Sequence, residues 1–259
     1  MKGVVCAGGE ATRLGELTRI TNKHLLPAGA YPMIFYPLKM LELAGVREVM
    51  IVTGQRHAGD FIDLLGDGCL ATRDGDDQLF DLEITYRVQT AAGGIAQAVG
   101  LAHSFIHPDE KFVVVLGDNI IERNIIEPVQ QFEKEPHGAA AIVLKEVDDP
   151  ERFGVPRFDD TGAIVEIIEK PGILAPGPAP SRYAVTGIYM YDSSVFDVIA
   201  NLQPSARGEY EITDVNNHYV RAGTLKHHFL DGWWRDAGTS TDSLIATADL
   251  IQRTGANNT

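Results

Sequence analysis

The sequence predicts an α/β protein whose central sheet is mostly parallel and covered by helices. Short runs rich in Val and Ile alternate with longer segments in which apolar residues recur at spacings of three and four. Two of the runs, "VVCAGG" and "VVVLGDN", stop at glycines and polar residues. This alternation is typical of crossover units, in which a helix joins two parallel strands.

The first half of the chain supplies most of these units. The expected strands are 3–7, 47–53, 82–89 and 111–118, and the expected helices between them are 33–45, 57–66 and 94–105. The acidic, turn-rich segment 67–81 reads as a solvated hairpin or excursion. In such sheets the loops that follow the strands gather at one edge, and ligands bind there.

The second half changes its pattern after residue 139. The expected elements are strands at 140–147, 164–170 and 182–192 and a helix at 211–223. Segment 171–181 is rich in Pro and Gly and is predicted to be a surface loop. We expect this half to extend the same sheet and to cover the other side of a pocket.

Composition and charge exclude several classes of protein. The 259 residues include 22 Lys plus Arg against 36 Asp plus Glu, a net charge of −14, which disfavours a nucleic-acid binder or a protein held to anionic lipid. No apolar stretch is long enough to span a bilayer and no signal-peptide core follows Met1, so we expect a cytoplasmic protein without a membrane partner. Cys6 and Cys69 are interpreted as structural thiols.

The segment "VVCAGGEATRL" (4–14) is a candidate phosphate-binding turn. It lacks both the P-loop pattern and the G-x-G-x-x-G fingerprint, so by itself it is more typical of a tight turn. Arg13 and Lys23 strengthen the candidate, because a forked guanidinium and a compact ammonium together suit a triphosphate. A pair of surface cations is the simpler alternative.

Carboxylates form the second group of candidate site residues. Asp118 follows an apolar strand, where a hard oxygen ligand can hold Mg²⁺ against substrate phosphates, although a strand-end Asp can equally cap a turn. Asp236 in "GWWRDAGT" offers a second carboxylate. Glu169 and Lys170 end another strand and place an acceptor for sugar hydroxyls beside a cation for phosphate; a surface ion pair is the alternative. No metal-ligand spacing involves the histidines, and no nucleophile or general base is indicated.

These motifs occur in one order along nearly the whole chain. The segment 8–38, "GGEATRLGELTRITNKHLLPAGAYPMIFYPL", resembles the signature of the sugar-1-phosphate nucleotidylyltransferases. Further motifs follow in the order shown by the bacterial glucose-1-phosphate thymidylyltransferases: "RVQTAAGGIAQA", "VLGDN", "DPERFGV", "IIEKP", "YAVTGIYMYD", "PSARGEYEITDVN" and "GWWRDAGT". The resemblance implies a Rossmann-like, three-layer nucleotidyltransferase fold. It implies one domain over 1–259, with a nucleotide-binding half at 1–138, a sugar-phosphate-binding half at 139–240 and a C-terminal helix and tail at 241–259.

The resemblance also implies roles for individual residues. The nucleotide would be bound by Gly8, Gly9, Ala11, Thr12, Arg13, Lys23, Gln89, Gly94 and Asp118. The sugar phosphate would be bound by Asn119, Gly154, Glu169, Lys170, Val185, Arg207 and Trp234. Asp118 and Asp236 would hold Mg²⁺, and Arg13, Lys23, Asp118 and Asp236 would form the catalytic set.

The reaction implied is transfer of a thymidylyl group from dTTP to glucose 1-phosphate. The resemblance also implies that the chain forms a homotetramer. Another nucleoside triphosphate or hexose 1-phosphate, or a homologue that senses ligands or supports assembly without turnover, are the alternatives. The first alternative stays open because base choice depends on few contacts, such as that of Gln89. Two departures motivate the second: Ala11 replaces the usual glycine, and Glu16 stands where proline is common. If position 11 needs a positive φ, alanine there costs on the order of 1 kcal/mol.

Overall fold

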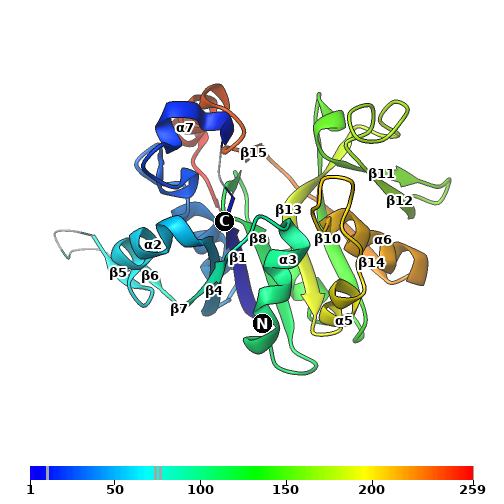
Figure 1. The fold of residues 1–259 in the computed structure, drawn as a ribbon, viewed down its shortest axis with the longest axis horizontal. Helices are drawn as coiled ribbons and strands as arrows, with labels where there is room; N and C mark the ends of the chain where they lie inside the picture. Colours follow the sequence, from blue (N-terminus) through cyan, green and yellow to red (C-terminus); the bar gives the residue numbers. More distant parts are fainter. Residues whose placement is uncertain (10–11, 73–74, 76–77, 259) are drawn as a thin grey trace.

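A seven-stranded sheet runs through the protein, as the computed structural model shows (Figure 1). The structure describes residues 1–9, 12–72, 75 and 78–258, but not the side chains of Thr12 and Arg13. In sheet order, the strands are β14 (Leu225–Phe229), β10 (Ala140–Glu146), β13 (Tyr183–Asp192), β8 (Lys111–Leu116), β1 (Lys2–Ala7), β4 (Glu48–Gly54) and β7 (Glu83–Gln89).

The sheet is mostly parallel, as predicted. Strand β1 runs parallel to β4 and β8, with Val4 opposite both Met50 and Val114. Strand β13 is antiparallel to both of its neighbours, β8 and β10. It joins the strands of the second half to those of the first, so one sheet crosses both halves.

Helices cover both faces of the sheet, because alternate residues of each strand point to opposite sides. Val5 and Ala7 of β1 belong to one core and Val4 and Cys6 to the other. The first core takes residues from α1 (Phe35–Leu43), α2 (Ala58–Leu65) and α4 (Ile126–Phe132), and the second from α3 (Ile95–Gly100), α5 (Val195–Ala200) and α6 (Ile212–Ala222). The result is the three-layer arrangement expected from the sequence.

The strand order reverses between β1 and β8. The chain leaves β1 through α1 to β4 and β7 on one side, and returns through α3 to β8 on the other. At the carboxyl ends of these two strands, the Gly117 amide donates to the Cys6 carbonyl at 2.9 Å. Such a switch point opens a crevice beyond the sheet, where ligands of α/β proteins bind.

Two-stranded antiparallel ribbons accompany the seven-stranded sheet. They pair β9 (Asn119–Ile121) with β15 (Trp234–Asp236), β11 (Gly154–Phe158) with β12 (Ile164–Glu169), β2 (Pro27–Ala28) with β3 (Tyr31–Pro32), and β5 (Cys69–Ala71) with β6 (Gln78–Asp81). The last pair confirms the hairpin predicted within 67–81. Helix α7 (Thr241–Thr254) follows β15 and packs near β2 (Figure 1).

Several helices are short or irregular. The segment expected as a helix at 94–105 is α3 followed by a 3-10 turn, η4 (Leu101–Ser104). The remaining 3-10 turns are η1 (Thr12–Thr18), η2 (Lys23–Leu25), η3 (Gln55–His57) and η5 (Pro150–Arg152). Gly15 interrupts η1 with a positive φ of 53°. Within the part of the chain that the structure describes, no helix has the length and hydropathy needed to cross a bilayer.

Candidate active site

The ribbon of β9 and β15 places the two predicted metal-binding carboxylates side by side. Asp236 is paired with Asn119, the residue after Asp118, and the amide of Ala237 donates to the Asp118 carbonyl at 2.9 Å. The two carboxyl groups are close enough that the charge on Asp118 adds to burial in raising the pKa of Asp236. Residues distant in sequence therefore meet at the carboxyl end of β8 because the backbone ladder fixes their register.

Lys23 belongs to the same cluster. Its ammonium group donates to Oδ2 of Asp118 and forms an ion pair with it. Asn22, just before η2, holds this lysine in place: its Oδ1 accepts from the His24 amide at 2.9 Å, and its Nδ2 donates to the Ala7 carbonyl at 3.2 Å. The cap of a short turn thus fixes Lys23 to the end of β1.

A glycine lets the backbone approach this cluster. A Cβ atom at Gly238 would lie 2.5 Å from Oδ2 of Asp118 and 2.7 Å from Nζ of Lys23. A Cβ atom at this position would require both side chains to shift, so glycine lets the loop after β15 lie against the cluster as it stands.

Burial and charge set the protonation of the cluster. Burial, together with the neighbouring Asp118, raises the pKa of Asp236 to about 8. Burial alone would also raise the pKa of Asp118, but the Lys23 ammonium outweighs it and holds that pKa below its usual value. Burial and the Lys23 charge lower the pKa of His24 to about 3, so its imidazole is neutral. Lys23 therefore offsets the charge of only one of the two carboxylates.

The cluster has the composition of a Mg²⁺ site. Oδ1 of Asp236 is buried and has no hydrogen-bond partner, which leaves a hard oxygen available to a cation. In the described residues no group of three or more acidic, His or Cys side chains could hold a metal. This fits Mg²⁺, which usually takes one or two carboxylates together with water and substrate phosphates. The residues present, Asp118 and Asp236, therefore suit the ion.

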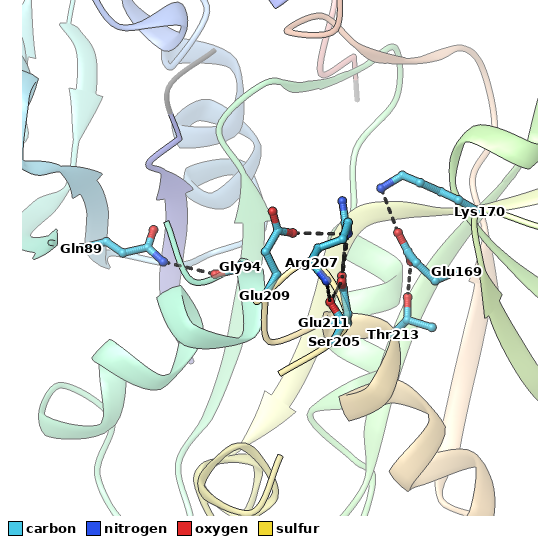
Figure 2. Close-up of polar contacts among 9 residues, drawn as sticks. All are labelled: Gln89, Gly94, Glu169, Lys170, Ser205, Arg207, Glu209, Glu211 and Thr213. Atoms are coloured by element: carbon cyan, nitrogen blue, oxygen red, sulfur yellow. Dashed lines mark hydrogen bonds and ion pairs between the residues drawn. The ribbon is translucent and has the colours of Figure 1, made fainter. Parts of the chain in front are cut away.

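The residues predicted to meet the base come together beside β1. A Cβ atom at Gly8 would lie 2.8 Å from Oε1 of Gln89, so the Gln89 amide rests against the glycine loop. Nε2 of Gln89 donates to the Gly94 carbonyl at 3.2 Å (Figure 2). It also donates to Oε1 of Gln97 at 2.8 Å. Gly9 and Gly94 have φ values of 101° and 91°, which only glycine adopts without strain.

Part of the predicted phosphate loop lies outside the described residues. This applies to Ala11 and to the side chains of Thr12 and Arg13, so their roles stay predictions. Glu16 belongs to η1 with its side chain 87% exposed, and it forms an ion pair with Arg19 at 3.2 Å. Its carboxylate therefore points to solvent.

The predicted sugar-phosphate residues approach one another from several elements. Gly154 of β11 is paired with Glu169 of β12, and Nζ of Lys170 lies 2.9 Å from Oε1 of Glu169. Figure 2 shows Arg207, from the loop before α6, beside this pair. Val185 is buried on β13, opposite Leu144 of β10.

Asn119 and Trp234 support Asp118. Oδ1 of Asn119 accepts from the Trp234 indole at 2.6 Å and from the Gly187 amide at 2.8 Å, and its Nδ2 donates to Oδ1 of Asp118 at 3.2 Å. Both side chains are buried. The polar atoms that the resemblance assigns to the sugar phosphate are thus used here to hold a carboxylate in place.

Sequence reasoning did not single out several of these supporting residues. They are Asn22, His24 and Gly238 at the carboxylate cluster, together with Glu211 and Thr213, whose side chains hydrogen-bond Arg207 and Glu169. An Asn one position before Lys23 is a recognisable capping signal, and a small residue after Asp236 indicates close backbone approach. The contacts of Glu211 and Thr213 depend on tertiary structure, which local patterns do not reveal.

The fold and the site together define a nucleotidyltransferase. The chain belongs to the nucleotidyl transferase family, whose model matches residues 2–253. It is 39% identical to a glucose-1-phosphate thymidylyltransferase of Neisseria meningitidis, over 97% of this chain and 83% of that protein. It is 37% identical to the low-salt glycan biosynthesis nucleotidyltransferase Agl11 of Haloferax volcanii, over 97% of this chain and 66% of that protein.

Solved structures agree with this class. A crystal structure from Bacillus anthracis, assigned as a glucose-1-phosphate thymidylyltransferase in complex with a sucrose, has a TM-score of 0.86 and 45% identity, covering 98% of this chain and 96% of that one. A UDP-glucose pyrophosphorylase complexed with UDP-glucose has a TM-score of 0.83 at 22% identity, which shows the fold alone. The family match and the thymidylyltransferase relatives support nucleotidyl transfer to a sugar 1-phosphate.

Proposed function

We propose that the protein transfers a thymidylyl group from dTTP to glucose 1-phosphate, which gives dTDP-glucose and pyrophosphate. A phosphate oxygen of glucose 1-phosphate attacks the α-phosphorus of dTTP. The new P–O bond forms as the bond from that phosphorus to the bridging oxygen of the pyrophosphate breaks. Electrons and atoms balance without a redox partner or a covalent enzyme intermediate.

One observation carries the proposal: Lys23, Asp118 and Asp236 meet at the switch point between β1 and β8. In-line phosphoryl chemistry depends on positioning and on neutralising charge rather than on a protein nucleophile. An ammonium group beside two carboxylates suits that demand. Mg²⁺, held by Asp118 and Asp236, would supply further neutralisation of charge on the phosphates.

The acceptor is recognised on the other side of the crevice. The Lys170 and Arg207 cations are suited to the phosphate of the sugar, and the Glu169 carboxylate is suited to accept from its hydroxyl groups. Lys170 and Glu169 form an ion pair, and Arg207 lies beside them (Figure 2). A sugar 1-phosphate presents both kinds of group to such a surface.

Thymine is the base we propose. The Gln89 amide lies against the glycine loop at the end of β7, where it can hydrogen-bond a pyrimidine edge. Support also comes from relatives named as glucose-1-phosphate thymidylyltransferases at 37–39% identity.

A panel assay tests the proposal. The protein is incubated with Mg²⁺, each of dTTP, UTP, ATP, CTP and GTP, and each of several hexose 1-phosphates, and pyrophosphate release is measured. We expect dTTP with glucose 1-phosphate to give the highest kcat/KM. A different preferred pair would replace the substrate assignment, and release no faster than that of a Lys23→Ala variant would favour a non-catalytic role.

A further inference from the structure

The start of α6 contacts two of the charged groups proposed to bind the acceptor, Arg207 and Glu169. Glu211 stands at the N-cap position of this helix, and Thr213 lies in its first turn. The Glu211 side chain makes no capping hydrogen bond to the amides of this helix. The side chains of Glu211 and Thr213 instead bond to residues outside the helix.

Glu211 holds the guanidinium of Arg207. Both of its carboxylate oxygens accept from Nη2 of Arg207 at 2.9 Å, and Oε1 also accepts from Nε at 3.3 Å (Figure 2). Ser205 adds a third donor, since its hydroxyl donates to the same Oε1 at 2.7 Å. With its side chain only 13% exposed, Glu211 holds Arg207 in a geometry that water screens little.

None of the hydrogen bonds described for Arg207 uses its Nη1. The guanidinium is therefore gripped along one edge while its outer nitrogen points away from Glu211 (Figure 2). An Arg held in this way presents a donor in a fixed direction, which suits recognition of a phosphate oxygen.

Thr213 holds Glu169 in a parallel manner. Its hydroxyl donates to Oε2 of Glu169 at 2.5 Å, while Oε1 faces Lys170. One turn further along, Asn217 exchanges two hydrogen bonds with the backbone of Ile167 in β12, at 2.8 and 2.7 Å. Thr213 and Asn217 are four residues apart and share a helix face. Helix α6 therefore fixes both the strand that carries Glu169 and the rotamer of its side chain.

We propose that Glu211 and Thr213 are positioning residues, which orient Arg207 for the phosphate and Glu169 for the hydroxyl groups of the acceptor. This inference rests on the proposed function, because it assumes that the pocket binds a sugar 1-phosphate. Two residues separated by one position on a rigid helix set the spacing between the two recognition groups. The fixed distance between Arg207 and Glu169 selects an acceptor whose phosphate and hydroxyl groups are separated by a matching distance.

Glu209 provides a matched control. It also forms an ion pair with Nη2 of Arg207, at 3.1 Å, but its side chain is 37% exposed and it makes one contact rather than several. An exposed single contact contributes little to fixing an arginine. Glu209→Gln and Glu211→Gln each remove one negative charge beside the Arg207 guanidinium. A difference between the effects of the two substitutions therefore reports how Glu211 positions Arg207.

Steady-state kinetics with dTTP and glucose 1-phosphate give the first test. For Glu211→Gln and for Thr213→Val, we expect the KM for glucose 1-phosphate to rise about tenfold or more, while the KM for dTTP changes less than about twofold. Glu209→Gln should change either constant less than about threefold. Thr213→Ser keeps the hydroxyl and should restore the KM for glucose 1-phosphate.

Three kinetic results would overturn the proposal: equal effects of Glu209→Gln and Glu211→Gln, a Thr213→Ser variant as impaired as Thr213→Val, or parallel increases in both KM values. Thermal melting of each variant accompanies the assay. A variant that does not fold is replaced by Ser205→Ala, which removes only one support of the Glu211 carboxylate and should give a smaller rise in the same KM.

A second measurement does not require turnover. The Nε–H signal of Arg207 is observed by NMR in ¹⁵N-labelled protein and assigned by its loss in Arg207→Lys. We expect a resolved signal that persists in Glu209→Gln. In Glu211→Gln, we expect this signal to move to the chemical shift of solvent-exposed arginines and to overlap with theirs. Persistence of the resolved signal in Glu211→Gln overturns the proposal even in an active enzyme, whereas absence of turnover by the wild-type protein counts against the proposed function alone.

Discussion

At the scale of single residues, Lys23 has the most direct role. Its ammonium is the only counter-charge that hydrogen-bonds Asp118 among the described contacts. We predict that Lys23→Met lowers kcat by about 100-fold to 1,000-fold, because preorganised charge at a phosphoryl group contributes on that scale. Pyrophosphate release measures it. Lys39→Met removes a lysine that is paired with Glu42 on α1, and should leave kcat unchanged.

Substitution of Asp236 is expected to change activity and stability in different directions. Its buried oxygen has no hydrogen-bond partner and its charge is opposed by Asp118, which is why its pKa lies well above the usual carboxyl value. Asp236→Asn replaces a carboxyl whose raised pKa lowers the stability of the folded state, because the amide does not ionise. We therefore expect a melting temperature in EDTA equal to or above that of the wild type, together with a higher Mg²⁺ requirement and lower kcat. A clear drop in the melting temperature would contradict this.

At the scale of elements, the loop after β15 depends on Gly238. Gly238→Ala would place a methyl group on Lys23 and Asp118, so we expect kcat to fall at least tenfold by displacement of the cluster by about 1 Å. Far-ultraviolet circular dichroism should be unchanged. Gly59→Ala in α2 is the control, since a Cβ atom there meets nothing within 4 Å; it should keep full activity and slightly raise stability.

Asp192, a buried carboxylate at the end of β13 and away from the site, stabilises this end of the strand. Asp192 accepts from the Gly138 amide at 2.6 Å, the Ser194 amide at 2.9 Å and the Ser194 hydroxyl at 2.5 Å. Asp192→Ala leaves three partly buried donors without their acceptor, so we expect the free energy of unfolding to fall by about 2–3 kcal/mol, with kcat unchanged. Urea denaturation measures it, and Asp197→Ala on exposed α5 surface should have little effect.

The elements were more predictable than the contacts between them. Strand positions followed from Val and Ile runs, because a buried parallel strand needs apolar residues on both faces. The helix expected at 94–105 ends early, at Gly100, and continues as a 3-10 turn. Local patterns could not show that Glu211 turns away from its own helix to bind Arg207, since that choice depends on a loop folded nearby.

At the scale of the whole molecule, the mostly parallel sheet and its three layers were predictable, and the reversal of strand order explains where the site lies. Chain order alone places Asp118 and Asp236 far apart. They meet because β15 returns to pair with β9, an antiparallel ribbon of three residue pairs that no periodicity in the sequence announces. Loop signals thus predicted the residue types proposed for the site, and tertiary pairing brings Asp118 and Asp236 together.

The central claim is that one crevice joins a nucleoside monophosphate to a sugar phosphate. ³¹P NMR of a mixture of protein, Mg²⁺, dTTP and glucose 1-phosphate tests it most directly, because each product has its own signals. The account predicts dTDP-glucose and pyrophosphate appearing in a 1:1 ratio, with no dTTP consumed when glucose 1-phosphate is omitted. Consumption of dTTP to dTMP at the same rate without the sugar phosphate, or no change in either substrate, would contradict it.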